Sequence, residues 1–217
     1  MRLAQRLVVL LLLIVAAPVW SAEDASWKLE KDKDGIQIYS RAVPGWEIRE
    51  MRGLTRYSGS LGSLVAVLTD PAVASELNEF VAKTSVEQRD SDTRYRLYTL
   101  TKMPWPLTDR DVLMQREIAQ DTRTGAVTVT DTATENLMPE KKGLVRIIKS
   151  RQQMTLTPNA DGSISIELRM LSDPRGPIPS SLMNSLSVST PFKTLAKLKE
   201  IAQRPKYAQA RPGFIKN

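Results

Sequence analysis

The chain has 217 residues, which is enough for one domain with a sizeable hydrophobic core or for two very small ones. It carries 31 Lys and Arg against 24 Asp and Glu, with no His and no Cys. The missing residue types exclude disulfides, an ordinary zinc site, a Ser-His-Asp triad and lipid attachment through cysteine. No basic helix or aromatic-basic stripe indicates a nucleic-acid partner. The moderate positive charge therefore indicates a solvated surface, with weak attraction to an anionic membrane as the alternative.

The N-terminal segment is typical of a secretory signal peptide. Two early arginines precede an almost wholly apolar run from Leu7 to Ala17, and small residues follow at Ser21 and Ala22. The run is too short for a comfortable membrane span. We expect cleavage after Ser21 or Ala22 and export to a periplasm, or secretion. An uncleaved anchor stays an alternative because Trp20 makes the cleavage site imperfect. Residues 1–22 are thus the predicted signal peptide and 23–204 the predicted domain.

The first half of the domain begins with three predicted strands. The first two, at 27–31 and 36–42, flank a turn that closes with Asp34-Gly35, and the third covers 47–57. Apolar residues then recur at helical spacing from Leu61 to Leu68. Asp70-Pro71 ends this helix and starts a second short one to about residue 77.

The remainder predicts six strands and one long helix. The strands are expected at 80–88, 93–103, 111–120, 126–134, 144–157 and 163–171. An amphipathic helix follows from about 179 to 203, and Pro191 inside it is expected to kink or break it. The last residues, 205–217, are expected to form a flexible tail.

This order of elements predicts an α+β fold. Nine antiparallel strands and one long amphipathic helix pack best when the sheet curls and lays its concave face over the helix. One helix is too narrow to fill a nine-stranded concave sheet. We therefore expect a residual cavity whose walls come from the inward faces of the strands.

The tract from Met103 to Asp111 reads MPWPLTDRD and lies between two predicted strands. Its prolines cannot donate to a sheet ladder, so the tract must be a stiff loop at the end of a hairpin. It holds Trp105 and Leu107 in a fixed pose. Two interpretations remain open on these residues alone, a lid or pocket wall and a rigid hairpin with a surface tryptophan.

Arg116 and Asp131 are polar exceptions on the apolar faces of neighbouring strands. Arg116 shares its face with Met114, and a turn at Thr124-Gly125 would bring Arg116 and Asp131 close to cross-strand register. A buried charge needs a partner. The two residues form either a structural ion pair, or an arginine that reaches solvent at the sheet end, or a polar anchor for the head group of an apolar ligand.

Several motifs in order resemble the START (steroidogenic-acute-regulatory-related lipid-transfer) domain family, over about residues 23–204. They are Trp27…Asp34-Gly35-Ile36…Tyr39, Pro104-Trp105-Pro106…Arg110-Asp111, Val145-Arg146 with Met154 to Pro158, and Ser172 to Pro179 with Leu182-Met183-Asn184. The resemblance implies the helix-grip fold, a curved antiparallel sheet around a C-terminal helix. It also implies that one lipid or sterol binds in the internal cavity.

Carried over residue by residue, the resemblance places the proline-flanked tract in a gating loop. It places Arg116 at a cavity position where relatives carry a basic residue. The carboxylate partner that some relatives have on the strand before the loop is not evident, because Arg96 and Tyr98 occupy that region, so Asp131 would have to substitute. The candidate ligand-binding residues of the cavity and gate are Trp105, Pro106, Leu107, Met114, Arg116, Asp131, Leu182, Met183 and Leu186.

We expect a non-enzymatic protein that binds a lipid, sterol or fatty-acid-like molecule, carries or senses it, and contacts membranes transiently. It would need no cofactor and no metal. The alternative is an enzyme of the helix-grip superfamily, a cyclase or hydratase, in which Arg116 and Asp131 supply electrostatic and acid-base roles. A third interpretation is an interaction module with an ordinary packed core, which predicts no cavity larger than a few waters.

Overall fold

The computed structural model describes residues 26–135 and 137–216. The predicted signal peptide and its cleavage site lie outside the described residues. Within the described ranges, no helix combines the length and the apolar character needed to cross a membrane.

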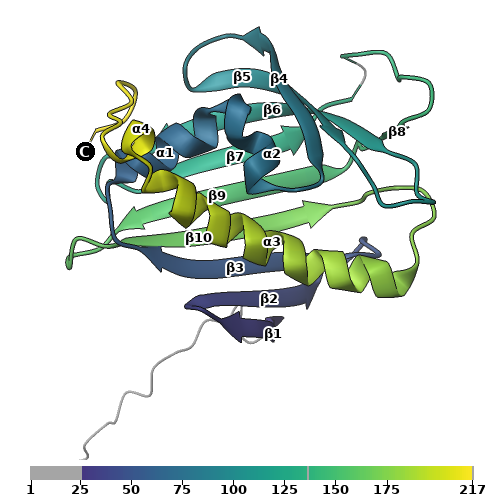
Figure 1. The fold of residues 1–217 in the computed structure, drawn as a ribbon, viewed down its shortest axis with the longest axis horizontal. Coiled ribbons are helices and arrows are strands. Elements are labelled where there is room, and N and C mark those ends of the chain that lie inside the picture. The colour runs from purple at the N-terminus through teal and green to yellow at the C-terminus, as the bar shows by residue number, and fades with distance from the viewer. Residues whose placement is uncertain (1–25, 136, 217) are drawn as a thin grey trace, which may run out of the picture.

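A nine-stranded antiparallel sheet curls around one long helix, as Figure 1 shows. Its strands lie in the order β1-β2-β3-β10-β9-β7-β6-β5-β4, so the N-terminal hairpins join the rest through the pairing of β3 with β10. The strands are β1 (Lys28–Lys33), β2 (Ile36–Ala42), β3 (Arg49–Tyr57), β4 (Val81–Arg89), β5 (Arg94–Thr101), β6 (Arg110–Gln120), β7 (Val127–Ala133), β9 (Ser150–Pro158) and β10 (Ile164–Ser172). The predicted α+β helix-grip fold is confirmed.

Local chemistry accounts for the tight turns and the first helix. Asp34 and Gly35 both have positive φ, at 53° and 70°, as a two-residue hairpin turn between right-twisted strands requires. Helix α1 (Leu61–Thr69) begins where the Ser60 hydroxyl accepts a hydrogen bond from the backbone N–H of Ser63, at 3.1 Å. The short 3-10 helix η2 (Pro71–Val73) and α2 (Ala74–Leu77) follow, as predicted.

Helix α3 (Ser180–Ala202) crosses the concave face of the sheet, and α1 and α2 lie beside it (Figure 1). It continues through Pro191 without a break. All of its fully buried residues lie from Pro191 onward; the apolar ones after the proline are Leu195, Leu198, Ile201 and Ala202. The first half has none. The second half of α3 is therefore part of the core, whereas the first half lies over the cavity described below.

One predicted strand is divided in the structure. Where the sequence predicts a single strand over 144–157, the chain forms the two-residue β8 (Val145–Arg146) and then β9. β8 pairs in parallel with the start of β6, so that Arg146 lies opposite Asp111. The guanidinium of Arg146 binds the carboxylate of Asp111 there, and β9 begins only at Ser150.

The C-terminal segment, predicted as a loose tail, packs against the domain. It forms α4 (Pro205–Ala208), and Tyr207 and Ile215 are buried. The hydroxyl of Tyr207 and the ammonium of Lys206 both donate to Asp70, at 2.8 and 2.6 Å. These contacts tie the segment to the end of α1, and no local pattern predicts them because the partners are far apart in the chain.

Candidate functional site

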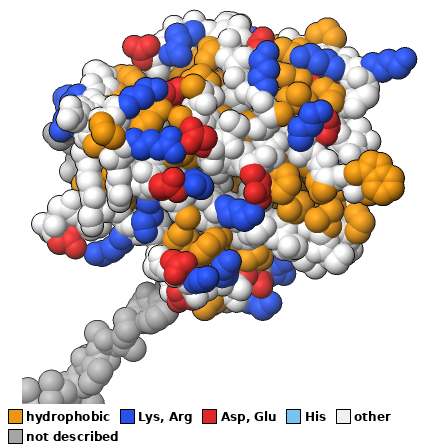
Figure 2. Space-filling view, in the orientation of Figure 1, with side chains coloured by type: hydrophobic (Ala, Val, Ile, Leu, Met, Phe, Trp, Pro, Cys, Tyr) orange, Lys and Arg blue, Asp and Glu red, His pale blue; other side chains and the backbone are white. Residues whose placement is uncertain are grey.

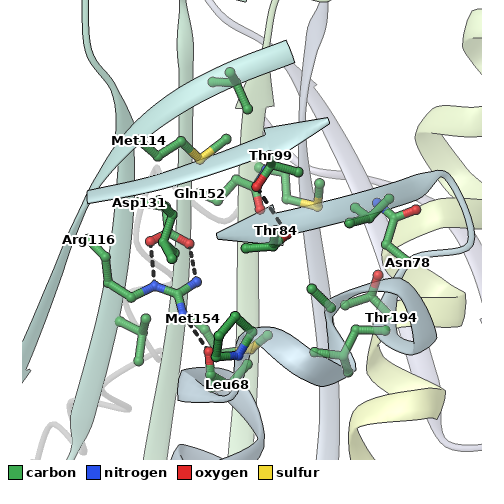
Figure 3. A pocket seen from close by; sticks show the side chains of 18 of the residues that line it. Leu68, Asn78, Thr84, Thr99, Met114, Arg116, Asp131, Gln152, Met154 and Thr194 are labelled. Carbon is green, nitrogen blue, oxygen red and sulfur yellow. Dashed lines mark hydrogen bonds and ion pairs between the residues drawn. The ribbon is translucent and has the colours of Figure 1, made fainter. Parts of the chain in front are cut away.

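An internal cavity of about 230 Å³ lies between the concave face of the sheet and the ends of α1 and α2. Figure 3 shows side chains from several strands and from these helices converging on it. Most of its wall is apolar, and its floor includes Met114, Val129, Met154 and Leu168. A single water needs only about 10–15 Å³ of such space. The interpretation as an interaction module with an ordinary packed core is therefore wrong.

Arg116 and Asp131 form the polar pole of this cavity. They are direct cross-strand partners on β6 and β7. The guanidinium donates from Nε to Oδ1 of Asp131 at 2.7 Å and from Nη2 to Oδ2 at 2.6 Å, a bidentate pair (Figure 3). Both side chains are about seven-eighths buried, with 14% and 12% exposure. Of the alternatives left open by the sequence, the structure has the two residues paired with one another.

The third contact of Arg116 uses the end of a helix. Its Nη1 donates to the carbonyl oxygen of Leu68, in the last turn of α1. Such carbonyls lack partners within the helix and lie at its negative pole. Burial lowers the pKa of the Arg116 guanidinium, but Asp131 and Tyr95 outweigh that effect and raise its pKa above the ordinary value. The arginine therefore stays charged, and its charge is neutralised within the protein.

A second cavity, of about 200 Å³, lies beneath the first half of α3 and adjoins the first. Asn78, Thr101, Met170 and Ser172 line both. We call the first the deep cavity and the second the outer cavity. Met183 and Leu186 of α3, two of the candidate residues of the cavity and gate, line the outer cavity. Leu182 is half-buried and lines neither cavity.

The proline-flanked loop lies beside the outer cavity, but its tryptophan does not line it. Met103 lines that cavity, whereas Trp105 is 93% exposed, Pro106 is exposed and Leu107 is half-buried. Asp109 holds the base of the loop by accepting from the backbone N–H of Met103 at 3.0 Å and from Lys102 at 2.6 Å. The interpretation of Trp105 as a pocket wall is therefore corrected, since the stiff loop presents the indole to solvent.

A buried polar network fixes this loop to the neighbouring ones. Arg110 is 2% exposed and donates to the carbonyl oxygens of Thr108, Pro174 and Arg175. Asp111 accepts from Arg146 at 2.8 and 2.9 Å and from the hydroxyl of Tyr98 at 3.1 Å. The loop before β6 and the segment before α3 are thus held in fixed relation. The sequence motif that contains Arg110-Asp111 does not by itself predict this network.

Several cavity residues were not predicted. Asn78, Thr84, Thr99 and Gln152 add polar groups to the deep cavity (Figure 3). Thr84 and Thr99 bond to one another through their hydroxyls at 3.2 Å. Strand parity could have placed Thr99, two residues from Leu97. The places of Asn78, Thr84 and Gln152 in the cavity wall depend on how elements that are distant in the sequence pack together.

The family assignment agrees with this geometry. The family model of the START domain matches residues 21–207. The chain belongs to the START domain family. Among curated relatives of this START protein, an uncharacterised protein of Pseudomonas aeruginosa is 30% identical over 183 residues, which are 84% of this chain and 89% of the relative. The phosphatidylcholine transfer protein of Mus musculus is 26% identical over 170 residues, with 74% of this chain and 76% of the relative covered.

Solved structures support the same assignment. The STAR-related lipid transfer protein of Xanthomonas axonopodis superposes with a TM-score of 0.75 at 34% identity, covering 82% of this START chain and 99% of that structure. Its bacterial source and the Pseudomonas relative show that this START chain has bacterial relatives.

Proposed function

We propose that this START domain binds one lipid in the deep and outer cavities and carries it between membranes without chemical change. The observation that carries the proposal is the mostly apolar deep cavity, with the mutually neutralised Arg116 and Asp131 among its lining residues. Apolar walls with few fixed polar groups are the usual form of a small-molecule site. The phosphatidylcholine transfer protein among the relatives supports a lipid as the cargo.

The same ion pair argues against catalysis. Arg116 and Asp131 hold each other in a bidentate contact, so neither is left free to give or take a proton from a substrate. Among the described residues, no group of acidic, histidine or cysteine side chains is placed to hold a metal ion. We therefore favour binding over the cyclase or hydratase alternative.

Organic extraction tests the proposal directly. We expect the purified mature protein to release a lipid that mass spectrometry identifies, and the delipidated protein to take up a fluorescent phospholipid from vesicles. The matched control is the variant Val129→Trp, whose indole would fill space beside Met154 in the deep cavity. An empty wild-type protein that takes up no lipid, sterol or fatty acid would contradict the proposal.

Trp105 provides a second test, through contact with a membrane. A fully exposed indole on a rigid loop is suited to the membrane-water interface, where tryptophan is enriched. We expect Trp105→Ala to slow lipid exchange with vesicles several-fold while changing the free energy of unfolding by about 0.5 kcal/mol or less. Stopped-flow transfer assays and urea denaturation measure the two. A large loss of stability with unchanged exchange would show that the indole is only structural.

We also propose that the chain works in the periplasm. The support is the N-terminal order of arginines, apolar run and small residues, together with the absence of cysteine. Fractionation of cells that produce the full chain tests this: a mature form lacking about the first twenty-two residues should appear in the periplasmic fraction.

A further inference from the structure

The outer cavity continues into a third hollow that opens at the surface. This hollow, which we call the vestibule, has a volume of about 800 Å³ and lies between the first half of α3, the strands β1 to β3 and the segment before α3. Seven residues line both the vestibule and the outer cavity, namely Ile48, Arg49, Met51, Pro174, Ile178, Met183 and Ser187. The deep cavity, the outer cavity and the vestibule therefore adjoin in series, and this series is the path that a ligand entering from solvent would follow.

Arg49 is the charged residue at the boundary of this path. Among the described residues, no other charged side chain lines the outer cavity. Farther out, the vestibule carries both signs of charge, including Lys28, Glu30 and Glu47. From the interior outward, a molecule along the path would meet the mutually neutralised Arg116 and Asp131, then mostly apolar walls, then the guanidinium of Arg49, and then a mixed charged surface.

The charge of Arg49 lies near that of Glu30 but, unlike the charge of Arg116, is not paired directly with a carboxylate. Arg49 donates from Nε to the hydroxyl of Ser40 at 2.8 Å and from Nη2 to the carbonyl oxygen of Ser40 at 3.4 Å. Ser40 in turn donates to Glu30 at 2.7 Å. No carboxylate of the described chain forms an ion pair with Arg49, whereas Asp131 neutralises Arg116.

We propose that Arg49 binds the phosphate of a single-chain phospholipid whose acyl chain occupies the outer and deep cavities. The head group lies in the vestibule, with its ammonium group near Glu47. Arginine matches phosphate oxygens in geometry and charge. The deep and outer cavities have volumes of about 230 and 200 Å³, so even together they lie toward the low end of the roughly 300–1,000 Å³ of ordinary ligand pockets, which suits a narrow single chain. The inference rests on the proposed function and names its ligand class.

Two probes with the same palmitoyl chain distinguish binding of the head group from binding of the acyl chain. Palmitoyl lysophosphatidylcholine carries the phosphate, and monopalmitoylglycerol does not. We expect Arg49→Gln to weaken binding of the first probe by about tenfold, the loss typical of a charge-assisted hydrogen bond, and to leave the second within about twofold. The affinity of Arg49→Lys for the first probe should lie between those of the wild type and Arg49→Gln, because lysine keeps the positive charge but lacks the planar guanidinium. Isothermal titration calorimetry below the critical micelle concentration measures the affinity of the wild type and of both variants for each probe.

The matched control is Arg56→Gln on the same strand. Arg56 is exposed, pairs with Asp161 on the outside of the domain and lines none of the three hollows, so both probes should bind this variant as they bind the wild type. Equal losses for both probes with Arg49→Gln, or no loss for either, would overturn the inference and leave the proposed function standing. Wild-type binding of neither probe would also overturn it. If extraction then yields no lipid, the proposed function fails as well.

Discussion

Replacing Asp131 by alanine is expected to lower the free energy of unfolding by about 3–5 kcal/mol. The change leaves the guanidinium of Arg116 buried with a single remaining acceptor, the carbonyl oxygen of Leu68. An uncompensated buried charge is among the most destabilising changes available to a domain. Urea denaturation followed by circular dichroism gives the free energy, and the expected loss is a large part of a typical domain's total stability.

A double variant separates the charge effect from the loss of packing. Arg116→Met with Asp131→Leu removes both charges and keeps apolar volume, so we expect it to be at least as stable as the wild type. As an external control, Asp161→Asn breaks an exposed pair with Arg56 and should change stability by about 1 kcal/mol or less. If Asp131→Ala costs no more than Asp161→Asn, solvent reaches Arg116 and the pair is not a structural unit.

Replacing Asp111 by alanine is expected to lower the free energy of unfolding by a similar amount, about 3–5 kcal/mol. The Asp111 carboxylate is fully buried, and the Arg146 side chain is 5% exposed. The hydrogen bonds that Arg146 donates to Asp111 raise the pKa of its guanidinium. Arginine keeps its charge in proteins, so removing Asp111 leaves Arg146 as a buried cation without its carboxylate partner. The same substitution also leaves the hydroxyl of Tyr98 without its acceptor.

The Asp111 variant should lose protection from amide exchange in a different part of the structure from the Asp131 variant. Asp111 holds β8 against β6, and Arg146 also donates to the carbonyl oxygens of Met138 and Pro139. We therefore expect faster amide exchange in residues 137–149 as well as a lower midpoint in urea. Asp109→Asn nearby, in an exposed pair with Lys102, is the control and should leave that exchange unchanged. Global destabilisation without local loosening would contradict this role of Asp111.

Strand parity and turn chemistry carried most of the correct predictions. Alternation placed Arg116 beside Met114 on the inner face, and the turn at Gly125, with its positive φ of 73°, set the register that brings Asp131 opposite. Such local rules suffice for hairpins because the side-chain period of a strand is two and the turn length fixes the pairing. They also predicted the cavity, since one helix cannot fill so wide a sheet.

Features that depend on contacts between elements distant in the chain could not be predicted from the sequence. The direction of the Trp105 side chain depends on how its loop sits against the segment before α3, which Arg110 fixes across more than sixty positions. Arg49 begins a strand and reads as an ordinary exposed arginine; its position is special only because α3 packs opposite it. Figure 2 shows how little the surface reveals, with charged and hydrophobic side chains intermixed over the visible face.

Because α3 is unevenly buried, its first half covers the cavities whereas its second half contributes to the stability of the core. Its second half is anchored by Leu195, Leu198 and Ile201, each fully buried, whereas no residue from 180 to 190 is. Pro191 lies at the junction and cannot donate to the carbonyl oxygen of Ser187, so one backbone bond fewer joins the halves. Lifting the first half would expose the cavities while the core stays intact. Substitutions that strengthen the core should therefore raise the melting temperature and leave the rate of cargo exchange unchanged.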